Sequence, residues 1–425
     1  MKLREDFLHY IWRFKQFDLQ KLITTSGDTV HIYNFGQYNT DGGADFLNGK
    51  IELNGRVWYG NIELHINASD WHRHKHNDNP AYNNVILHVV FNADQTIIRS
   101  NGEAIPTVEL RGRIPLKLKN TYLRLLNEKE WIPCANQIQN VPSFIKTSWL
   151  DRLTIERLEQ KTQLIEASLN RNNNNWEETF YQMIARSFGL HINVDPFERV
   201  AQKLPLITLT KHKDNLFQLE SLLFGQAGLL QGDFQETYPN RLKKEFDFLQ
   251  KKHQLEPIPK TMWQFLRLRP PSFPTIRLAQ FAALIHQSTH LFSKVLDVKT
   301  IEDIEELLVV KMSDYWQTHY VFDKESTKRK KTLGKSTIHL IVINTIAPLL
   351  FLYGQKKKDE DFKEKAIQLL EAIPAESNSV IKKWATLDLK PENAYQSQAL
   401  LQLKKHYCKL KRCLHCNIGN NILRK

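Results

Sequence analysis

The chain has 425 residues, of which 41% are hydrophobic and 25% are charged, and its formal net charge at pH 7 is +13. This composition predicts a folded protein of two or three domains and excludes a largely disordered chain, because the apolar residues suffice to fill hydrophobic cores. The excess of Lys and Arg favours polyanionic partners such as nucleic acid through non-specific electrostatic attraction.

The sequence predicts neither export nor a membrane span. The first residues, MKLREDFLHYIW, carry charges where a signal peptide would be apolar. The longest apolar run, residues 338–353, is interrupted by His339, Asn344 and Pro348 and is shorter than a spanning helix needs. Only four Cys residues occur, which argues against a disulfide framework and makes a reducing cytoplasm the expected compartment.

A helix followed by three antiparallel strands is expected at the start of the chain. The apolar residues with helical spacing are Leu3, Phe7, Leu8, Ile11, Trp12 and Phe14. Residues 29–35 then alternate as a strand, and a turn over residues 39–43 follows. Asn54-Gly55 is a strong hairpin signal between a strand that begins at Asp45 and a strand over residues 56–66.

Three side chains of this hairpin form a candidate metal site. Glu63 and His65 are two positions apart on one strand and therefore project from the same face. The hairpin folds the start of the preceding strand, with Asp45, back beside them. Carboxylates supply the oxygen ligands that Mg²⁺ and Mn²⁺ prefer, so we expect Asp45 and Glu63 to hold one of these ions. Such an ion can acidify a bound water and polarise a phosphate, which indicates phosphodiester hydrolysis.

The pattern resembles the PD-(D/E)XK nuclease superfamily, whose core is a helix, three antiparallel strands, a helix and a further strand. In that superfamily Asp opens the second strand and Glu-x-Lys lies on the third. Here Ala44 stands in place of the Pro and His65 in place of the Lys. The resemblance implies a restriction-endonuclease-like α/β domain over residues 1–112 that cleaves nucleic acid, with Asp45, Glu63 and His65 as catalytic residues.

The same resemblance implies two further roles. His65 would stabilise the attacking hydroxide or the charge that develops on the phosphate, provided that it has the right protonation state. Glu5, on the expected first helix, could join the metal site, although an acid in the first turn of a helix also suits the helix dipole.

A longer set of motifs is similar to an uncharacterised bacterial family, domain of unknown function 2851. The motifs are NTDGGADF at residues 39–46, WYGNIELH at 58–65, DWHRHKH at 70–76 and VILHVV at 85–90. This resemblance spans the whole chain and implies no known activity, so the chemistry has to be argued from the residues.

Several histidines lie close together in the same region, and imidazole is the commonest transition-metal ligand. They are His65, His72, His74, His76 and His88. They could draw a softer ion such as Zn²⁺ to the same cleft. His74-x-His76-x-Asp78 is also similar to the start of the metallo-β-lactamase zinc motif, although Asn79 replaces its next His. The plainer alternative is a solvated loop, with His88 hydrogen-bonded inside a strand.

From residue 115 onward the apolar spacing becomes helical, which predicts a mostly α-helical domain over residues 115–400. A proline-rich interruption of this pattern carries Arg267, Arg269 and Arg277. These side chains could clamp phosphates in bidentate fashion, or they could satisfy local carbonyl groups.

A basic, Cys-rich tail is expected over residues 401–425. Cys408, Cys413 and Cys416 are flanked by Lys and Arg residues, which favour thiolates, and a soft metal would hold such thiolates. We expect a structural Zn²⁺ there, with either Cys134 or His406 as the fourth ligand. Three reduced thiols without a metal are the plainer alternative.

The sequence therefore predicts a metal-dependent nuclease, with two alternatives. One is a nuclease-like fold without catalytic activity that only binds nucleic acid or another protein. The other is a zinc-dependent hydrolase that uses the histidines. Nucleic-acid binding that does not depend on Asp45 or Glu63 would favour the non-catalytic alternative.

Overall fold

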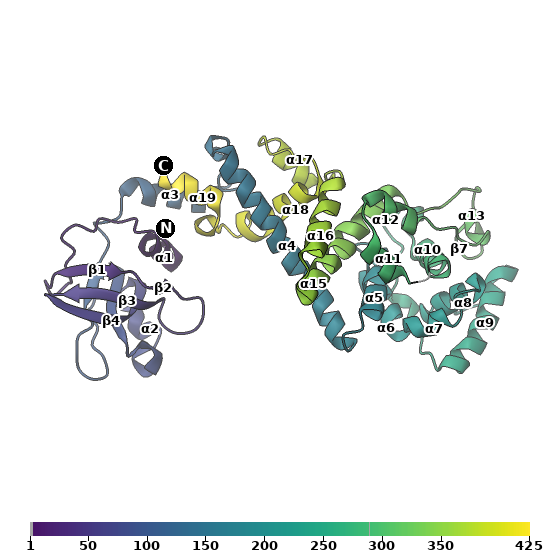
Figure 1. Cartoon of the computed structure of the whole chain (residues 1–425), viewed down its shortest axis with the longest axis horizontal. Helices are drawn as coiled ribbons and strands as arrows, with labels where there is room; N and C mark the ends of the chain where they lie inside the picture. Colours follow the sequence, from purple (N-terminus) through teal and green to yellow (C-terminus); the bar gives the residue numbers. More distant parts are fainter. Residues whose placement is uncertain (1–2, 289) are drawn as a thin grey trace. The chain divides into compact units, whose positions relative to one another are not determined.

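The computed structural model describes residues 3–288 and 290–425, and the chain forms two compact units (Figure 1). The mixed unit contains the chain up to Trp149 together with Leu403–Lys425, and the helical unit is Leu150–Gln402. This division differs from the expected boundary near residue 112 and from the expected separate tail, because the last residues pack with the N-terminal part of the chain.

A six-stranded sheet forms the centre of the mixed unit. Its strands are β1 (Val30–Asn34), β2 (Gln37–Tyr38), β3 (Phe46–Leu53), β4 (Arg56–Asn67), β5 (Val85–Asn92) and β6 (Thr107–Glu109). The order is β1-β3-β4-β5-β6, with β2 paired to β3. The β1, β3 and β4 pairings are antiparallel, whereas β5 runs parallel to β4 and β6 runs parallel to β5.

The predicted hairpin is confirmed. Leu53 pairs with Arg56 across a two-residue turn in which Asn54 has φ +47° and Gly55 has φ +82°. A turn with positive φ at both central residues matches the twist of the flanking strands, and Asn-Gly adopts it at little cost. The resulting register places Phe46 opposite Ile62, which brings the start of β3 beside the middle of β4.

The predicted first helix is also confirmed as α1 (Glu5–Arg13). Its buried residues are Phe7, Leu8, Tyr10, Ile11 and Trp12. The parallel strand β5 requires a crossover from β4, and this is made by α2 (Asp70–Arg73) and two short turns, η1 (His76–Asp78) and η2 (Pro80–Tyr82). Trp71 and Val85 of this region lie in one apolar cluster with Ala68.

The last residues of the chain complete the mixed unit. They form the end of a helix, η7 (Leu403–Cys408), a 3₁₀ turn, η8 (Cys413–His415), and a final helix, α19 (Asn417–Arg424). Lys411 Nζ donates to Leu126 O at 2.5 Å and to Glu128 O at 3.0 Å, at the end of α3 (Leu116–Asn127). These bonds fasten residues 403–425 to the N-terminal part of the chain.

The helical unit confirms the predicted change to helical structure. It continues from α4 (Ser143–Arg171) through α5 (Trp176–Phe188), α6 (Val194–Lys203), α7 (Leu206–Thr210), α8 (Leu216–Gln226), α9 (Thr237–His253), α10 (Pro274–Gln287), α11 (Leu291–Asp297), α12 (Ile301–Leu308), α13 (Tyr315–Thr318), α14 (Lys335–Ile341), α15 (Ala347–Lys357), α16 (Glu360–Ala372), α17 (Ser379–Ala385) and α18 (Ala394–Gln402). A small hairpin, β7 (His319–Val321) and β8 (Lys324–Glu325), interrupts the helices.

The four Asn residues 172–175 separate α4 from α5 for a local reason. Asn173 and Asn174 have positive φ values, which the right-handed helix does not allow, and Asn175 caps α5 by accepting a hydrogen bond from Glu178 N at 3.1 Å.

One helical stretch within the described residues, Lys335–Lys357, is long and apolar enough to cross a membrane. Most of it is buried inside the helical unit, where Ile343, Ile346 and Leu350 belong to the core. Its burial in this core accounts for its apolar composition.

Candidate metal centre

Three imidazole nitrogens meet beside β4. His65 Nε2 lies 3.1 Å from His74 Nδ1 and 3.2 Å from His76 Nε2, and the three atoms lie within 4.8 Å of one another. Two ligands that each lie about 2.0–2.1 Å from a tetrahedral Zn²⁺ are separated by about 3.3 Å. The two short separations are close to this value, so His65, His74 and His76, here called the histidine cluster, could hold a metal ion.

The carboxylate of Glu63 lies against two members of the histidine cluster. Glu63 Oε1 is 3.2 Å from His76 Nε2 and 3.6 Å from His65 Nε2. The predicted arrangement of Glu63 and His65 on one face of β4 accounts for their closeness. Three imidazoles with a carboxylate beside them could hold an ion, with Glu63 as a further ligand or as a base for a bound water.

A reversal of the backbone brings His74 and His76 to the same point. His74 follows α2, His76 begins η1, and Lys75 between them has φ +57°. This left-handed conformation is uncommon for a residue with a side chain. It turns the chain so that residues on either side both reach His65.

Aromatic side chains hold the imidazoles in place. Tyr82 stacks on His76 with ring centroids 3.8 Å apart, and its hydroxyl donates to Gly43 O at 3.2 Å. Trp71 packs edge-on against His65 and His76. Behind the histidine cluster, His88 Nε2 lies 2.8 Å from His65 Nδ1. Contacts of this kind orient metal ligands and fix their tautomers.

Burial sets the charge state of these groups. It lowers the pKa of His65 to about 2 and that of His88 to about 3, and neighbouring imidazoles add to the effect. The pKa values of His74 and His76 are also lowered, mainly by burial. All four rings are therefore neutral at pH 7, which is the form that binds metals. Burial and the charge of Asp45 raise the pKa of Glu63 to about 9, and a nearby cation would favour its carboxylate form instead.

The carboxylate of Asp45 lies between α1 and the strand that carries Glu63 and His65. Asp45 Oδ2 accepts a hydrogen bond from Leu64 N at 3.0 Å and lies 3.2 Å from His9 Nε2. Asp45 N donates to Glu63 Oε2 at 3.0 Å. Burial raises the pKa of Glu5, and the charge of Asp45 raises it further, so this predicted residue also lies near the site.

His9 is a site residue that the sequence reasoning missed. It follows Glu5 by one helical turn, so the two side chains lie on one face of α1, and this spacing was the available signal.

The other two predicted site histidines, His72 and His88, do not belong to the histidine cluster. His72 is exposed and lies outside the histidine cluster, whereas His88 is buried behind it. His74 is itself exposed, so the histidine cluster is reached from solvent on that side.

The three predicted arginines belong to the helical unit. Arg267 and Arg269 are exposed. Arg277 is buried in α10, where it donates to Gln280 Oε1 at 3.1 Å and to Thr337 Oγ1 at 3.3 Å, and burial lowers its pKa to about 10. Its guanidinium therefore links α10 to α14.

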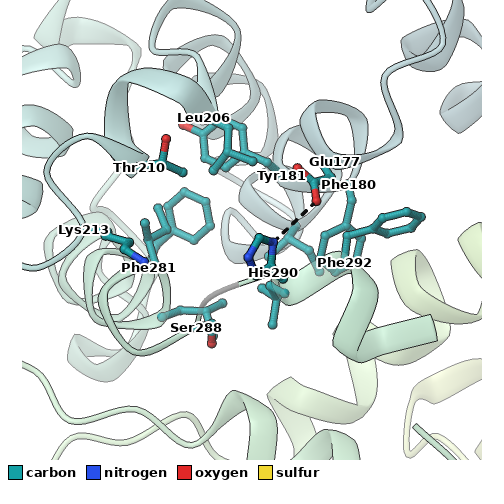
Figure 2. Close-up of a pocket in the computed structure, with 14 residues that line it drawn as sticks. Glu177, Phe180, Tyr181, Leu206, Thr210, Lys213, Phe281, Ser288, His290 and Phe292 are labelled. Atoms are coloured by element: carbon teal, nitrogen blue, oxygen red, sulfur yellow. Dashed lines mark ion pairs between the residues drawn. The ribbon is translucent and has the colours of Figure 1, made fainter. Parts of the chain in front are cut away.

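The helical unit also has a cavity of about 230 Å³, shown in Figure 2. Aromatic rings line it: Phe180, Tyr181, Phe281 and Phe292. At its rim His290 Nδ1 lies 4.0 Å from Glu177 Oε1. The lining is mainly apolar, so the cavity suggests no reaction.

Fold and site together define a two-unit α+β protein with a histidine-rich candidate metal centre. The chain belongs to the family described as "Protein of unknown function (DUF2851)", whose model matches residues 5–379. The matched region includes the whole histidine cluster and Cys134 but ends before Cys408, Cys413 and Cys416. Comparisons with curated proteins and with solved structures gave no match.

Proposed function

We propose that the chain is a metal-dependent hydrolase that cleaves nucleic-acid phosphodiesters and uses a transition-metal ion such as Zn²⁺. The convergence of His65, His74 and His76 beside Glu63 is the observation that carries this proposal. Imidazoles suit Zn²⁺, whereas Mg²⁺ prefers oxygen ligands and keeps several waters. The ion expected from Asp45 and Glu63 alone is therefore replaced in this proposal by a softer one.

The order of elements supports hydrolysis of phosphodiesters. A helix, the antiparallel strands β1, β3 and β4, a short helix and a parallel strand occur in this order in the mixed unit, with the two-residue strand β2 added beside β3, which is similar to the core of the PD-(D/E)XK nucleases. Asp45 lies at the start of β3, and Glu63 and His65 lie on β4, at the positions that this resemblance implies. A restriction-endonuclease-like domain is accordingly part of the proposal.

The substrate class is supported by charge and by an exposed aromatic surface. The chain carries a net charge of +13. Tyr33 and Tyr59 are 52% and 68% exposed, and Lys50 Nζ lies 5.1 Å and 5.2 Å from their ring centroids. Exposed rings on which bases stack, with a cation between them, are typical of surfaces that bind single-stranded nucleic acid.

The chemistry follows from the groups that face the ion. A Zn²⁺ ion bound there would acidify a water and polarise the scissile phosphate. Glu63 Oε1, beside His65 and His76, is in position to accept the proton of the attacking water. Asp45 holds the backbone of β4 at Leu64 and so keeps Glu63 and His65 in register. A reducing cytoplasm, expected from the few cysteines, is the proposed compartment.

The test compares His74→Ala with His72→Ala, because both residues are exposed and close in sequence but only His74 belongs to the histidine cluster. Purified protein is incubated with single- and double-stranded DNA and RNA after treatment with a chelator and addition of Zn²⁺, Mn²⁺ or Mg²⁺. We expect cleavage that needs added Zn²⁺, is lost in His74→Ala and in Glu63→Gln, and is retained in His72→Ala.

Two results would contradict the proposal. Cleavage that is equal in wild type, His74→Ala and Glu63→Gln would come from a contaminating nuclease. Tight binding without cleavage under every ion would favour the non-catalytic, nucleic-acid-binding alternative.

A further inference from the structure

The cavity of the helical unit, here called the aromatic cavity, is not used by the proposed hydrolysis (Figure 2). Helices α5, α7, α10 and α11 contribute to its wall. Phe180 and Ile184 are one helical turn apart on α5, and Phe281 and Ile285 are one turn apart on α10, so one face of each helix lines it. Small-molecule sites are often found between packed helices.

The aromatic rings of the wall are positioned by contacts within the protein. Tyr181 and Phe281 stack with ring centroids 5.7 Å apart, and Phe180 and Phe292 also lie 5.7 Å apart. All four rings are buried. The hydroxyl of Tyr181 donates to Leu204 O at 2.8 Å, so this polar group is already satisfied. Packing of the helical unit itself therefore forms an apolar wall.

The volume of the aromatic cavity sets the size of the ligand that fits. An apolar cavity of about 150 Å³ can hold one benzene molecule. The aromatic cavity measures about 230 Å³, so it has room for a larger body, such as two fused aromatic rings. Aromatic rings make favourable offset-stacked and edge-to-face contacts with one another. An aromatic ligand therefore suits this lining better than an aliphatic chain does.

A lysine without a partner also lines the aromatic cavity. Lys213 is half-buried, and within the described residues its ammonium group makes no ion pair or hydrogen bond. Its backbone is held in place, because His286 Nδ1 donates to Lys213 O at 2.6 Å. Ser288, two residues after His286, lines the cavity as well and supplies a hydroxyl group. A cation and a hydroxyl at the edge of an apolar cavity suit a carboxylate.

The remaining charged groups of the lining face one another at the rim. Glu177 Oε1 lies 4.0 Å from His290 Nδ1, and the two side chains are 54% and 79% exposed. Water and salt screen charges that are exposed to this extent. Lys213 is therefore the charged group of the lining that is available to pair with a ligand.

We propose that the aromatic cavity binds a small aromatic carboxylate. The aromatic body lies among the four rings, and the carboxylate pairs with Lys213 and accepts a hydrogen bond from Ser288. A few polar groups at the edge of an apolar cavity typically fix the orientation of a ligand and its specificity. The aromatic cavity belongs to the helical unit and the histidine cluster belongs to the mixed unit, so this proposal does not depend on the proposed function.

The test uses naphthoate, which carries one carboxylate on two fused rings, and isothermal titration calorimetry of the full chain. We expect saturable binding with a Kd between micromolar and millimolar. Lys213→Met removes the positive charge but keeps an unbranched apolar side chain, and it should weaken binding about tenfold or more, as expected for loss of a charge-assisted hydrogen bond. Lys211→Met is the matched control, because this neighbouring lysine is exposed and lies outside the lining. It should bind naphthoate like wild type.

Three further ligands and one further variant test the parts of the proposal. Naphthylmethanol lacks the charge, acetate lacks the rings, and octanoate has an aliphatic chain in their place, so each should bind more weakly than naphthoate. Ile285→Trp places a larger side chain at a half-buried position of the lining and should abolish binding. Circular dichroism shows whether this variant is folded, and Lys213→Met provides the decisive comparison if it is not.

Four results would overturn the proposal. They are no binding at millimolar naphthoate, equal affinities of wild type and Lys213→Met, equal losses in Lys213→Met and Lys211→Met, and binding of naphthylmethanol as tight as that of naphthoate. Octanoate that binds as tightly as naphthoate would overturn the assignment of an aromatic ligand.

Discussion

His65 Nδ1 lies 2.8 Å from His88 Nε2, and the opposite nitrogen of His65 faces both His74 and His76. A proton on Nδ1 that is donated to His88 leaves Nε2 of His65 with a free lone pair, which is the state required of a metal ligand. His88 is fully buried, and its own Nδ1 has no hydrogen-bond partner among the described residues. When His65 is the donor in this contact inside the sheet, its Nε2 is therefore free to bind a metal ion.

Replacing His88 with Phe should weaken metal binding about 10- to 100-fold, the usual effect of removing a group that orients a metal ligand. Phe keeps an aromatic ring on β5 but cannot accept the proton from His65. Competition with a chromophoric chelator measures the affinity, and His72→Ala serves as the control. An affinity equal to that of wild type would show that His88 does not orient His65.

Replacing Gly419 with Ala should destabilise the mixed unit by about 1–3 kcal/mol, since the new methyl group would overlap Cys413 O. Gly112→Ala is a matched control in the same unit, because nothing lies within 4 Å of its added Cβ and its φ is not positive. Urea denaturation of both variants provides the comparison. Equal midpoints for the two variants would contradict the close packing of α19 on the turn η8.

Replacing Tyr59 with Ala should weaken binding of single-stranded nucleic acid about 5- to 150-fold, the loss that corresponds to about 1–3 kcal/mol for one stacked base. This prediction rests on the proposed function. Tyr59→Phe should restore binding because the ring alone supports stacking, and Ile98→Ala, which removes another exposed apolar side chain of the same unit, should leave it unchanged. Fluorescence anisotropy with a labelled oligonucleotide measures the affinity. Equal losses in Tyr59→Ala and Ile98→Ala would argue against a stacking surface.

Glu220 should make the stability of the helical unit depend on pH. Burial raises its pKa from 4.5 to about 7, although hydrogen bonds from Tyr238 and Ser313 oppose this shift. Because the folded state binds the proton more tightly, the contribution of Glu220 is fully present below pH 4.5 and is lost as the pH rises through about 7. The loss amounts to up to about 3 kcal/mol.

The measurement for Glu220 is the difference in unfolding free energy between wild type and Glu220→Gln from pH 4 to pH 8. The variant cannot ionise, so it should gain stability relative to wild type as the pH rises. A difference that is constant across this range would contradict the raised pKa. Taking the difference removes the contributions of other groups that titrate in both proteins.

Local features of the sequence were enough to predict the elements that frame the site. The positive φ values at Asn54 and Gly55 suit these two residue types, so the hairpin and the closeness of Glu63 and His65 on one strand face follow from neighbouring residues. The amphipathic spacing of α1 is equally local, and the structure confirms this helix.

Tertiary structure alone decided which of the candidate ligands meet. His72 and His74 look equivalent in the sequence, yet of the two only His74 contacts His65, and the left-handed Lys75 then turns the chain so that His76 reaches the same point. The position of His88 behind His65 depends on the parallel pairing of β4 with β5, which residue spacing does not specify. The segment that leads to Cys134 lies beside the end of the chain, where Lys404 Nζ donates to Trp131 O, only because folding brings distant segments together, and such long-range proximity results from packing of the whole unit.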